Sequence, residues 1–214
     1  MRRGLNHDEH QFVASAALLA RQGLLPYRDF AYFHMPTLVL VDALLFVLTD
    51  HLLLAARLVS LVSATLTASL LLLLAMRLLL NLTPGRRALA AVLTVLLLIA
   101  TPATIHASGR AWNHDLPILL ALAAFVPLAI GLARRRLHWA WLAVAGLLIG
   151  AAAGVRLSFA PLALPFLLAA IYLAPDCAVS RWRAFVLFSL GVLLGLLPAI
   201  VLFGLAPEQF LFGN

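Results

Sequence analysis

Asp8 and Glu9 are adjacent carboxylates in the opening stretch NHDEHQF (residues 6–12), where histidines flank them. The chain has only eight carboxylates among 214 residues, so a neighbouring pair is unusual here. A carboxylate at a membrane surface can act as a general base that takes the proton of an incoming hydroxyl. The alternative is helix capping, because Asn6 followed three residues later by Glu9 is close to a capping box, and acids suit the positive end of a helix. Capping is the simpler interpretation when this stretch is taken alone.

A third acid, Asp115, stands in the stretch SGRAWNHDLP (residues 108–117). Its position before Pro117 is typical of a helix N-cap with proline in the first turn. If Asp115 faces the same side of a membrane as Asp8, it could instead be a second acid of the same site. The residues alone leave both interpretations open.

Three arginines, Arg57, Arg110 and Arg156, lie apart from the other basic residues, within or beside apolar runs. An arginine at the centre of a membrane span costs about 2.5–3.5 kcal/mol on insertion scales. An anionic partner would offset that cost, and phosphate suits a forked guanidinium best. We therefore expect at least one of the three to bind phosphate, with lipid headgroup contact as the alternative.

The histidines raise the question of a metal site. His7, His10, His34, His106 and His114 could bind a divalent metal together with Asp8 or Glu9, but no pair has a recognised ligand spacing. The sequence contains no glycine-rich phosphate loop and no G-x-S-x-G motif. A single cysteine, Cys177, leaves no internal disulfide and no thiol metal cluster. The sequence therefore predicts no particular cofactor and leaves a divalent metal open.

The composition indicates a membrane protein. Hydrophobic residues make up 64% of the chain and charged residues 11%, and the mean hydropathy is +1.07. At roughly 20 residues for each helical crossing, the chain has room for about six or seven spans. The net charge of +7 comes from arginine alone. Because these arginines separate apolar runs, they indicate membrane topology, and we expect no nucleic-acid partner.

Residues 1–50 are expected to form an outer surface loop. Helical spacing over residues 7–23 predicts an amphipathic helix on the membrane surface, ended by Gly23. Residues 24–35 are aromatic and mixed, as in an interfacial loop. Residues 36–48 are apolar but too short to cross comfortably, which predicts an interfacial or re-entrant helix.

Residues 51–214 are expected to form the transmembrane part of one all-α, polytopic domain. Six apolar runs are predicted to cross the membrane: 51–79, 88–106, 116–133, 139–155, 157–173 and 184–205. Basic residues fall in three loops that two crossings separate from one another: Arg77, Arg86 and Arg87; Arg134, Arg135 and Arg136; and Arg181 and Arg183. The positive-inside rule places these loops in the cytoplasm, so every carboxylate except Asp176 is expected on the outer side.

Three segments carry a family resemblance: DEHQFVASAALLARQGLLPYRDFAYFHMP (8–36), AARLVS (55–60) and SGRAWNHDLPILLALA (108–123). Together they resemble the GT-C membrane glycosyltransferases. Within that family the chain looks most like the bacterial relatives of protein O-mannosyltransferases, aminoarabinose transferases and lipopolysaccharide galacturonosyltransferases. The resemblance extends over most of the chain, with its more specific motifs in the first segment.

The resemblance implies roles for particular residues. It places the catalytic acidic residue of the first outer loop on Asp8, with Glu9 beside it. An arginine that opens the next span falls on Arg57, and a second R…D pair on Arg110 and Asp115. The family's P-Y-x-D-F…H-x-P element falls on Tyr27, Asp29 and His34, with Met35 where proline is usual.

The resemblance also implies an activity and a location. The expected reaction is an inverting transfer of a hexose or pentose from a polyprenyl-phosphate donor to a hydroxyl of a lipid or glycan acceptor. It would take place among membrane lipids, on the outer face of a bacterial inner membrane. The family has a membrane helix before the first outer loop and runs to roughly twice this length. We therefore expect these residues to be the N-terminal half without that helix, which leaves open whether they are active alone.

The competing class is a transport or structural membrane protein. In that case the outer arginines would line an anion path, and Asp8 and Glu9 would only cap a helix. A transporter often has charged or broken helices at mid-membrane and inverted repeats, which the sequence does not clearly contain. A folded remnant without activity is a third alternative.

Overall fold

The computed structural model describes residues 7–134, 139–173 and 179–214, and the regular elements of these residues are helices joined by loops. Eleven α-helices and one 3-10 helix form over these residues, so the predicted all-α class is confirmed. Their bounds are α1 (His7–Gln22), α2 (Thr37–Phe46), α3 (Leu52–Leu78), α4 (Pro84–Ala100), α5 (Pro102–Ala107), α6 (Asp115–Arg134), α7 (Trp139–Val155), η1 (Leu157–Leu162), α8 (Ala163–Leu173), α9 (Arg181–Gly195), α10 (Leu197–Leu205) and α11 (Pro207–Gly213).

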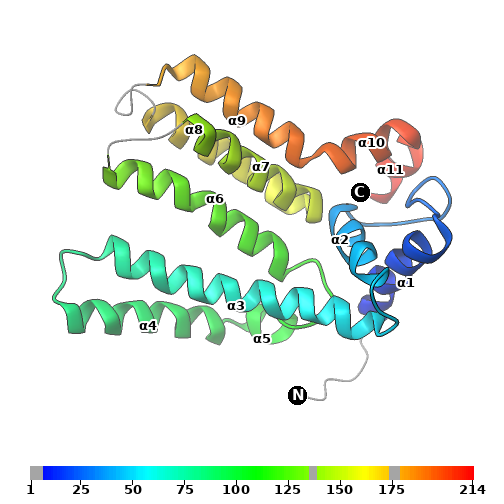
Figure 1. Cartoon of the computed structure of the whole chain (residues 1–214), viewed down its shortest axis with the longest axis horizontal. Coiled ribbons are helices and arrows are strands. Elements are labelled where there is room, and N and C mark those ends of the chain that lie inside the picture. The colour runs from blue at the N-terminus through cyan, green and yellow to red at the C-terminus, as the bar shows by residue number, and fades with distance from the viewer. Residues whose placement is uncertain (1–6, 135–138, 174–178) are drawn as a thin grey trace.

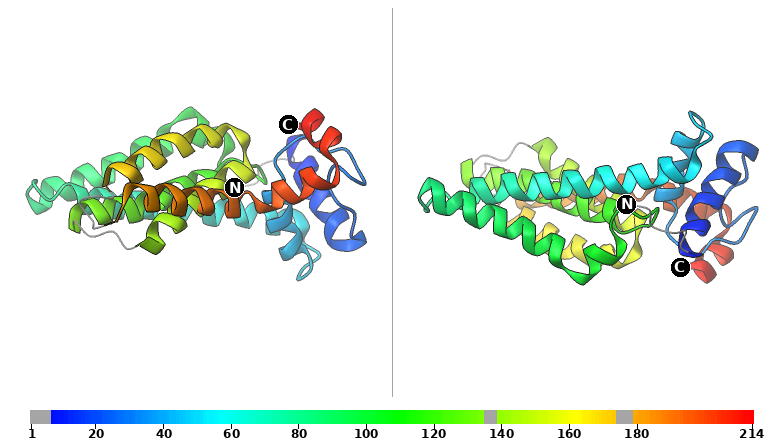
Figure 2. Two further views of the ribbon diagram at one scale, coloured as in Figure 1. Left: turned by 90° about the horizontal axis from the view of Figure 1, so that it is seen from above. Right: turned by 90° about the horizontal axis from the view of Figure 1, so that it is seen from below.

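The longer helices lie alongside one another in an elongated bundle (Figures 1 and 2). Helices α1, α2, α10 and α11 gather at one end, together with α5 and the start of α6 (Figure 1). We call this the site end. The connection between α3 and α4 and the start of α9 lie at the opposite end, which we call the basic end (Figure 1). Helices α1 and α2 of the first fifty residues thus lie at the end opposite the α3–α4 connection and the start of α9.

Glycines allow α7 and α9 to pack backbone against backbone. A Cβ added to Gly146 on α7 would lie 2.1 Å from the carbonyl oxygen of Phe188, and one added to Gly191 on α9 would lie 2.2 Å from that of Ala143. No larger residue fits at such distances. This contact fixes the α7 end that carries Arg156.

Two buried apolar clusters hold the molecule together. One lies in the bundle and joins α6, α7, α8 and α9 through residues such as Leu142 and Phe188. The other lies at the site end, where Phe12 of α1 and Phe46 of α2 share a cluster with Val155 of α7. Helices α1 and α2 are thus packed onto the bundle and positioned by it.

Most helices lie close to the residue ranges predicted from the sequence, and prolines explain the main differences between prediction and structure. The expected helices over 7–23, 36–48 and 139–155 correspond to α1, α2 and α7. The run 88–106 is divided by Pro102 into α4 and α5. The run 184–205 is divided before Pro198 into α9 and α10, which bend by 57°. Proline lacks the N–H of the helical ladder, so a helix breaks or bends there.

The number of membrane-length helices differs from the sequence-based expectation of six. In the described parts of the chain, α3 is long and apolar enough to cross a membrane, and the bent pair α9–α10 is a second candidate if it counts as one crossing. Other apolar helices, including α7 and the η1–α8 pair, are shorter. Prolines divide some of the apolar runs, and other apolar helices are too short. The length and composition of the helices therefore do not support six membrane spans.

Some sequence-based interpretations fall outside the described residues. They concern Asn6 as a helix cap, Arg135 and Arg136 in the second basic loop, Asp176 as the one inner carboxylate, and Cys177.

Candidate functional site

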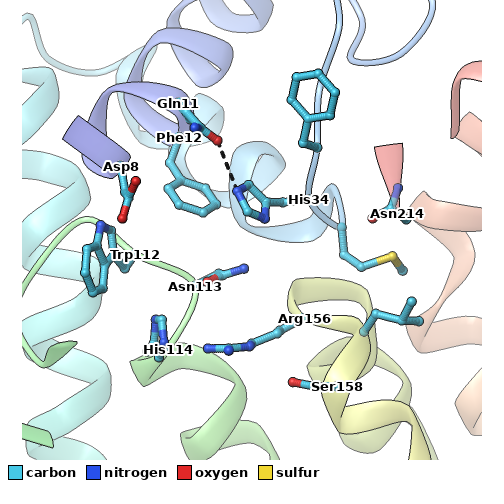
Figure 3. Close-up of a pocket in the computed structure, with 13 residues that line it drawn as sticks. Asp8, Gln11, Phe12, His34, Trp112, Asn113, His114, Arg156, Ser158 and Asn214 are labelled. Carbon is cyan, nitrogen blue, oxygen red and sulfur yellow. Dashed lines mark hydrogen bonds between the residues drawn. The ribbon is translucent and has the colours of Figure 1, made fainter. Parts of the chain in front are cut away.

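A cavity of about 580 Å³ lies at the site end, where segments distant in sequence meet (Figure 3). Its walls come from α1, the 33–35 segment, the loop before α6, the α7–η1 junction and Asn214. The polar and aromatic side chains in the walls include Asp8, His34, Trp112, His114, Arg156 and Ser158. We call this space the Asp8 cavity.

The two acids in the first turn of α1, Asp8 and Glu9, point in different directions. Asp8 is exposed and lines the cavity, beside the ring of Trp112 (Figure 3). Glu9 is 1% exposed and is not among the cavity-lining residues. Successive helical residues point about 100° apart, since a turn takes 3.6 residues. Of the two acids, Asp8 alone therefore lines the Asp8 cavity.

Glu9 binds Arg57 instead. The Arg57 Nε donates to Glu9 Oε1 at 2.9 Å, and Arg57 Nη2 donates to Oε2 at 2.7 Å. The backbone N–H of Ala111 also donates to Oε1 at 2.9 Å. These bonds join α1, α3 and the loop before α6. The ion pair occupies both groups. Glu9 could act in catalysis, or Arg57 could bind phosphate, as predicted from the sequence, only if this pair opened.

Arg156 is the arginine that faces the Asp8 cavity. It follows the last residue of α7, in an extended conformation with φ −150° and ψ 117°. Its side chain points toward His114 (Figure 3). Within the described ranges no carboxylate forms an ion pair with it. A half-buried guanidinium that forms no ion pair with a carboxylate is suited to an anionic ligand.

Arg110, the third arginine expected to bind substrate, lies over the Trp112 ring with 5.0 Å between its Cζ and the ring centroid. This is a cation–π contact. Arg110 is not among the residues that line the Asp8 cavity. It therefore supports the wall formed by Trp112.

The two histidines of the cavity are held neutral. Burial lowers the pKa of His114 to about 4, and the charge of Arg156 adds to the effect. Burial also lowers the pKa of His34, although the Asp8 carboxylate opposes it. The His34 Nε2 is 3.1 Å from Gln11 Oε1, and its ring stacks on Phe12 with 4.8 Å between centroids. At neutral pH the two imidazoles of the cavity are thus uncharged, and they lie in its wall together with the side chains of Asp8 and Arg156.

Tyr27 and Asp29 lie outside the Asp8 cavity, and Tyr27 contacts two residues of its wall. Tyr27 has a φ of 65°, which is rare for a bulky residue. Its hydroxyl donates to the carbonyl oxygen of His34 and accepts from Asn214 Nδ2 at 3.3 Å. Asp29 binds Arg28 and accepts from the Leu25 N–H at 2.7 Å. Both residues line a neighbouring groove beside α11.

Asp115 lies at the same end of the bundle as Asp8 but in a different space. Its Oδ2 accepts from the Gly109 N–H at 2.9 Å, and the residue is buried. It lines a separate cavity of about 490 Å³ between α3, α4, α5 and α6. The structure therefore does not bring Asp115 together with Asp8, contrary to the expectation of a shared site.

Sequence reasoning missed Trp112 as a wall of the site, and considered His114 only as a metal ligand. Both stand in the stretch 108–117 that was selected for its acid, so the signal was present but assigned to Asp115. No group of three or more histidines, cysteines and carboxylates suited to a metal ion occurs among the residues that the structure describes.

Comparisons with protein-family models, with curated proteins and with solved structures each gave no match.

Proposed function

We propose that this chain belongs to a membrane glycosyltransferase that moves a sugar from a polyprenyl-phosphate donor to an acceptor hydroxyl. The observation that carries the proposal is that Asp8 and Arg156 line one cavity. One residue supplies a carboxylate exposed to that cavity. The other supplies a guanidinium without a carboxylate partner among the described residues.

The chemistry assigns one role to each residue. Asp8 accepts the proton of the acceptor hydroxyl as its oxygen bonds to the anomeric carbon. The bond from that carbon to the phosphate oxygen breaks, and the polyprenyl phosphate leaves with the electron pair. Arg156 stabilises the negative charge that develops on the leaving phosphate. Because polyprenyl phosphate, a phosphate monoester, is already a good leaving group, a separate general acid is not obligatory, and inversion follows from the single displacement.

The proposal includes a position in the membrane. Many apolar side chains of α3 are exposed, among them Leu58, Leu61 and Leu66, as a lipid-facing helix requires. The shorter apolar helices α6, α7 and η1–α8 would also lie in the bilayer as a polytopic domain. With the basic end in the cytoplasm, the Asp8 cavity would open on the outer face of a bacterial inner membrane.

One observation favours transport as a second candidate. The bent pair α9–α10 is a broken apolar helix, and broken helices are typical of transporters. A transporter would move a lipid-linked or free anion past Arg156 and leave the glycosidic bond intact. Product analysis therefore separates the two functions.

The test is an assay of the intact gene product in membranes. Radiolabelled polyprenyl-phosphate hexoses and pentoses are supplied, and release of polyprenyl phosphate is measured. Asp8→Asn should lower turnover by about 100-fold or more. Asp50→Asn is the matched control, since Asp50 is exposed near the same end and lies outside the Asp8 cavity. Unchanged turnover in Asp8→Asn, or no release from any donor, would reject the proposal.

A further inference from the structure

The basic end contains arginines from three separate helices. Arg77 lies in the last turn of α3, Arg86 and Arg87 in the first turn of α4, and Arg181 and Arg183 in the first turn of α9. These helix ends lie on the same side of the bundle, opposite the site end, with the end of α6 between the α3–α4 connection and the start of α9 (Figure 1). Every described carboxylate lies toward the site end, on α1, α2, α11, the start of α6 or the loops beside α2.

The arginines at the starts of α4 and α9 are placed against the helix dipole. A helix N-terminus carries a partial positive charge, so cations there are unfavourable unless an anion is nearby. The three ion pairs of the described chain all involve other arginines, at the site end. The Nε of Arg87 is buried and has no hydrogen-bond partner there. An external anion would satisfy both the guanidinium groups and the helix N-termini.

Aromatic side chains accompany these arginines. Trp182, between Arg181 and Arg183, is 71% exposed, and its ring stacks on Phe185 at 5.4 Å between centroids. Trp139, at the start of α7, is exposed as well. Beyond them along α9 come exposed leucines such as Leu190 and Leu193. Cations, then indole rings, then aliphatic chains follow the order of phosphate, interface and hydrocarbon across a leaflet.

We infer that the basic end is a docking surface for anionic phospholipid headgroups. The surface comprises Arg77, Arg86, Arg87, Arg181, Arg183 and Trp182. Arginine forks bind the headgroup phosphates, and the Trp182 ring lies at the level of the glycerol backbone. The inference requires that the protein lies in a membrane, as proposed above, but it does not require glycosyl transfer. Its test is therefore separate from the test of the role of Asp8.

The experiment uses quenching of tryptophan fluorescence by brominated lipids in phosphatidylcholine nanodiscs that contain the full chain. A small fraction of the lipid is replaced by brominated phosphatidylglycerol or, in a parallel sample, brominated phosphatidylcholine. The difference between wild type and Trp182→Phe gives the quenching of Trp182 itself. We expect phosphatidylglycerol to be enriched around Trp182 by about fivefold, the preference that one arginine near an anionic surface supplies.

Two further samples make the result decisive. The variant Arg86→Gln/Arg87→Gln/Arg181→Gln/Arg183→Gln should quench equally with both lipids, whereas Arg21→Gln/Arg28→Gln, changed at the site end, should keep the preference. If the fourfold variant does not fold, salt titration of the wild type serves instead, because about 0.5 M salt should remove most of the preference. Equal quenching of the wild type by both lipids would overturn the inference. A preference that survives the fourfold substitution or high salt would overturn it too.

Discussion

The Glu9 carboxylate and the Arg57 guanidinium form a bidentate ion pair between helices α1 and α3, with hydrogen bonds of 2.9 and 2.7 Å. Because the same carboxylate accepts the Ala111 N–H, the pair also holds the loop that carries Trp112. Asp8, next to Glu9 in sequence, is thereby presented to the cavity that Trp112 borders. The Glu9–Arg57 pair thus joins the turn of α1 that carries Asp8 to α3 and to the loop before α6.

Glu9→Gln should destabilise the folded protein by about 2–3 kcal/mol. The value lies between those of exposed and fully buried pairs, since Arg57 is 24% exposed while Glu9 is 1% exposed. The free energy of unfolding in a mild detergent measures the effect. Asp50→Asn is the control, because its pair with Arg21 is open to solvent and should contribute less than about 1 kcal/mol. Equal stability of the two variants would show that the buried pair is not a structural element.

Gly150→Ala should loosen the contact between α7 and α9. A Cβ at Gly150 would lie 2.2 Å from the carbonyl oxygen of Val192, so the helices must separate. Overpacking of this kind costs about 1–3 kcal/mol. Gly204→Ala on α10 is a matched control, because its Cβ would meet nothing within 4 Å. Thermal unfolding of both variants in detergent should show a loss for Gly150→Ala alone, and a shared loss would contradict the close packing.

The lowered pKa of His114 should make stability depend on pH. The unfolded chain takes up this proton near the ordinary value of 6.5, and the folded chain near 4. Stability therefore falls as the pH drops through that window, because the unfolded state binds the proton first. His114→Gln should remove a loss on the order of 1–3 kcal/mol between pH 7 and 4. Identical pH profiles of wild type and variant would indicate that His114 is solvated in the folded protein.

Asp42 should act in the opposite direction. It is buried on α2, and burial raises its pKa to about 7 from an ordinary value of 3.8. The unfolded chain loses this proton first as the pH rises, so stability falls as the pH climbs from 3.8 to 7. Asp42→Asn, which stays neutral, should gain a few kcal/mol over wild type at pH 7, at about 1.4 kcal/mol for each pKa unit. Unfolding of the two proteins at pH 5 and 7 checks this, and a gain that is the same at both values would argue against a neutral Asp42.

The sequence was sufficient to predict several of the helices. Helical spacing predicted α1, and apolar runs predicted α2 and α7, close to their observed ends. The 57° bend before Pro198 was not predicted, because membrane helices often tolerate proline and the sequence does not say which proline will break one. The number of crossings was overestimated for the same reason.

The site was predicted in part. Asp8, His34 and Arg156 were all chosen from the sequence and do line one cavity. The pairing of Glu9 with Arg57 was not foreseen, since 48 residues separate them and spacing carries no information about contacts made by tertiary packing. Asp115 and Asp8 line different cavities. Their separation comes from tertiary packing, which has no local signal in the sequence.

The most direct test of the Asp8–Arg156 site compares two arginine variants in the donor assay. Arg156→Gln should lower kcat/KM for polyprenyl-phosphate sugar by about 100-fold or more, as expected when a donor to a developing anion is removed. Arg28→Gln, whose arginine pairs with Asp29 outside the Asp8 cavity, should keep the wild-type value. Equal kcat/KM for Arg156→Gln and wild type would contradict the assignment of the leaving phosphate to this cavity.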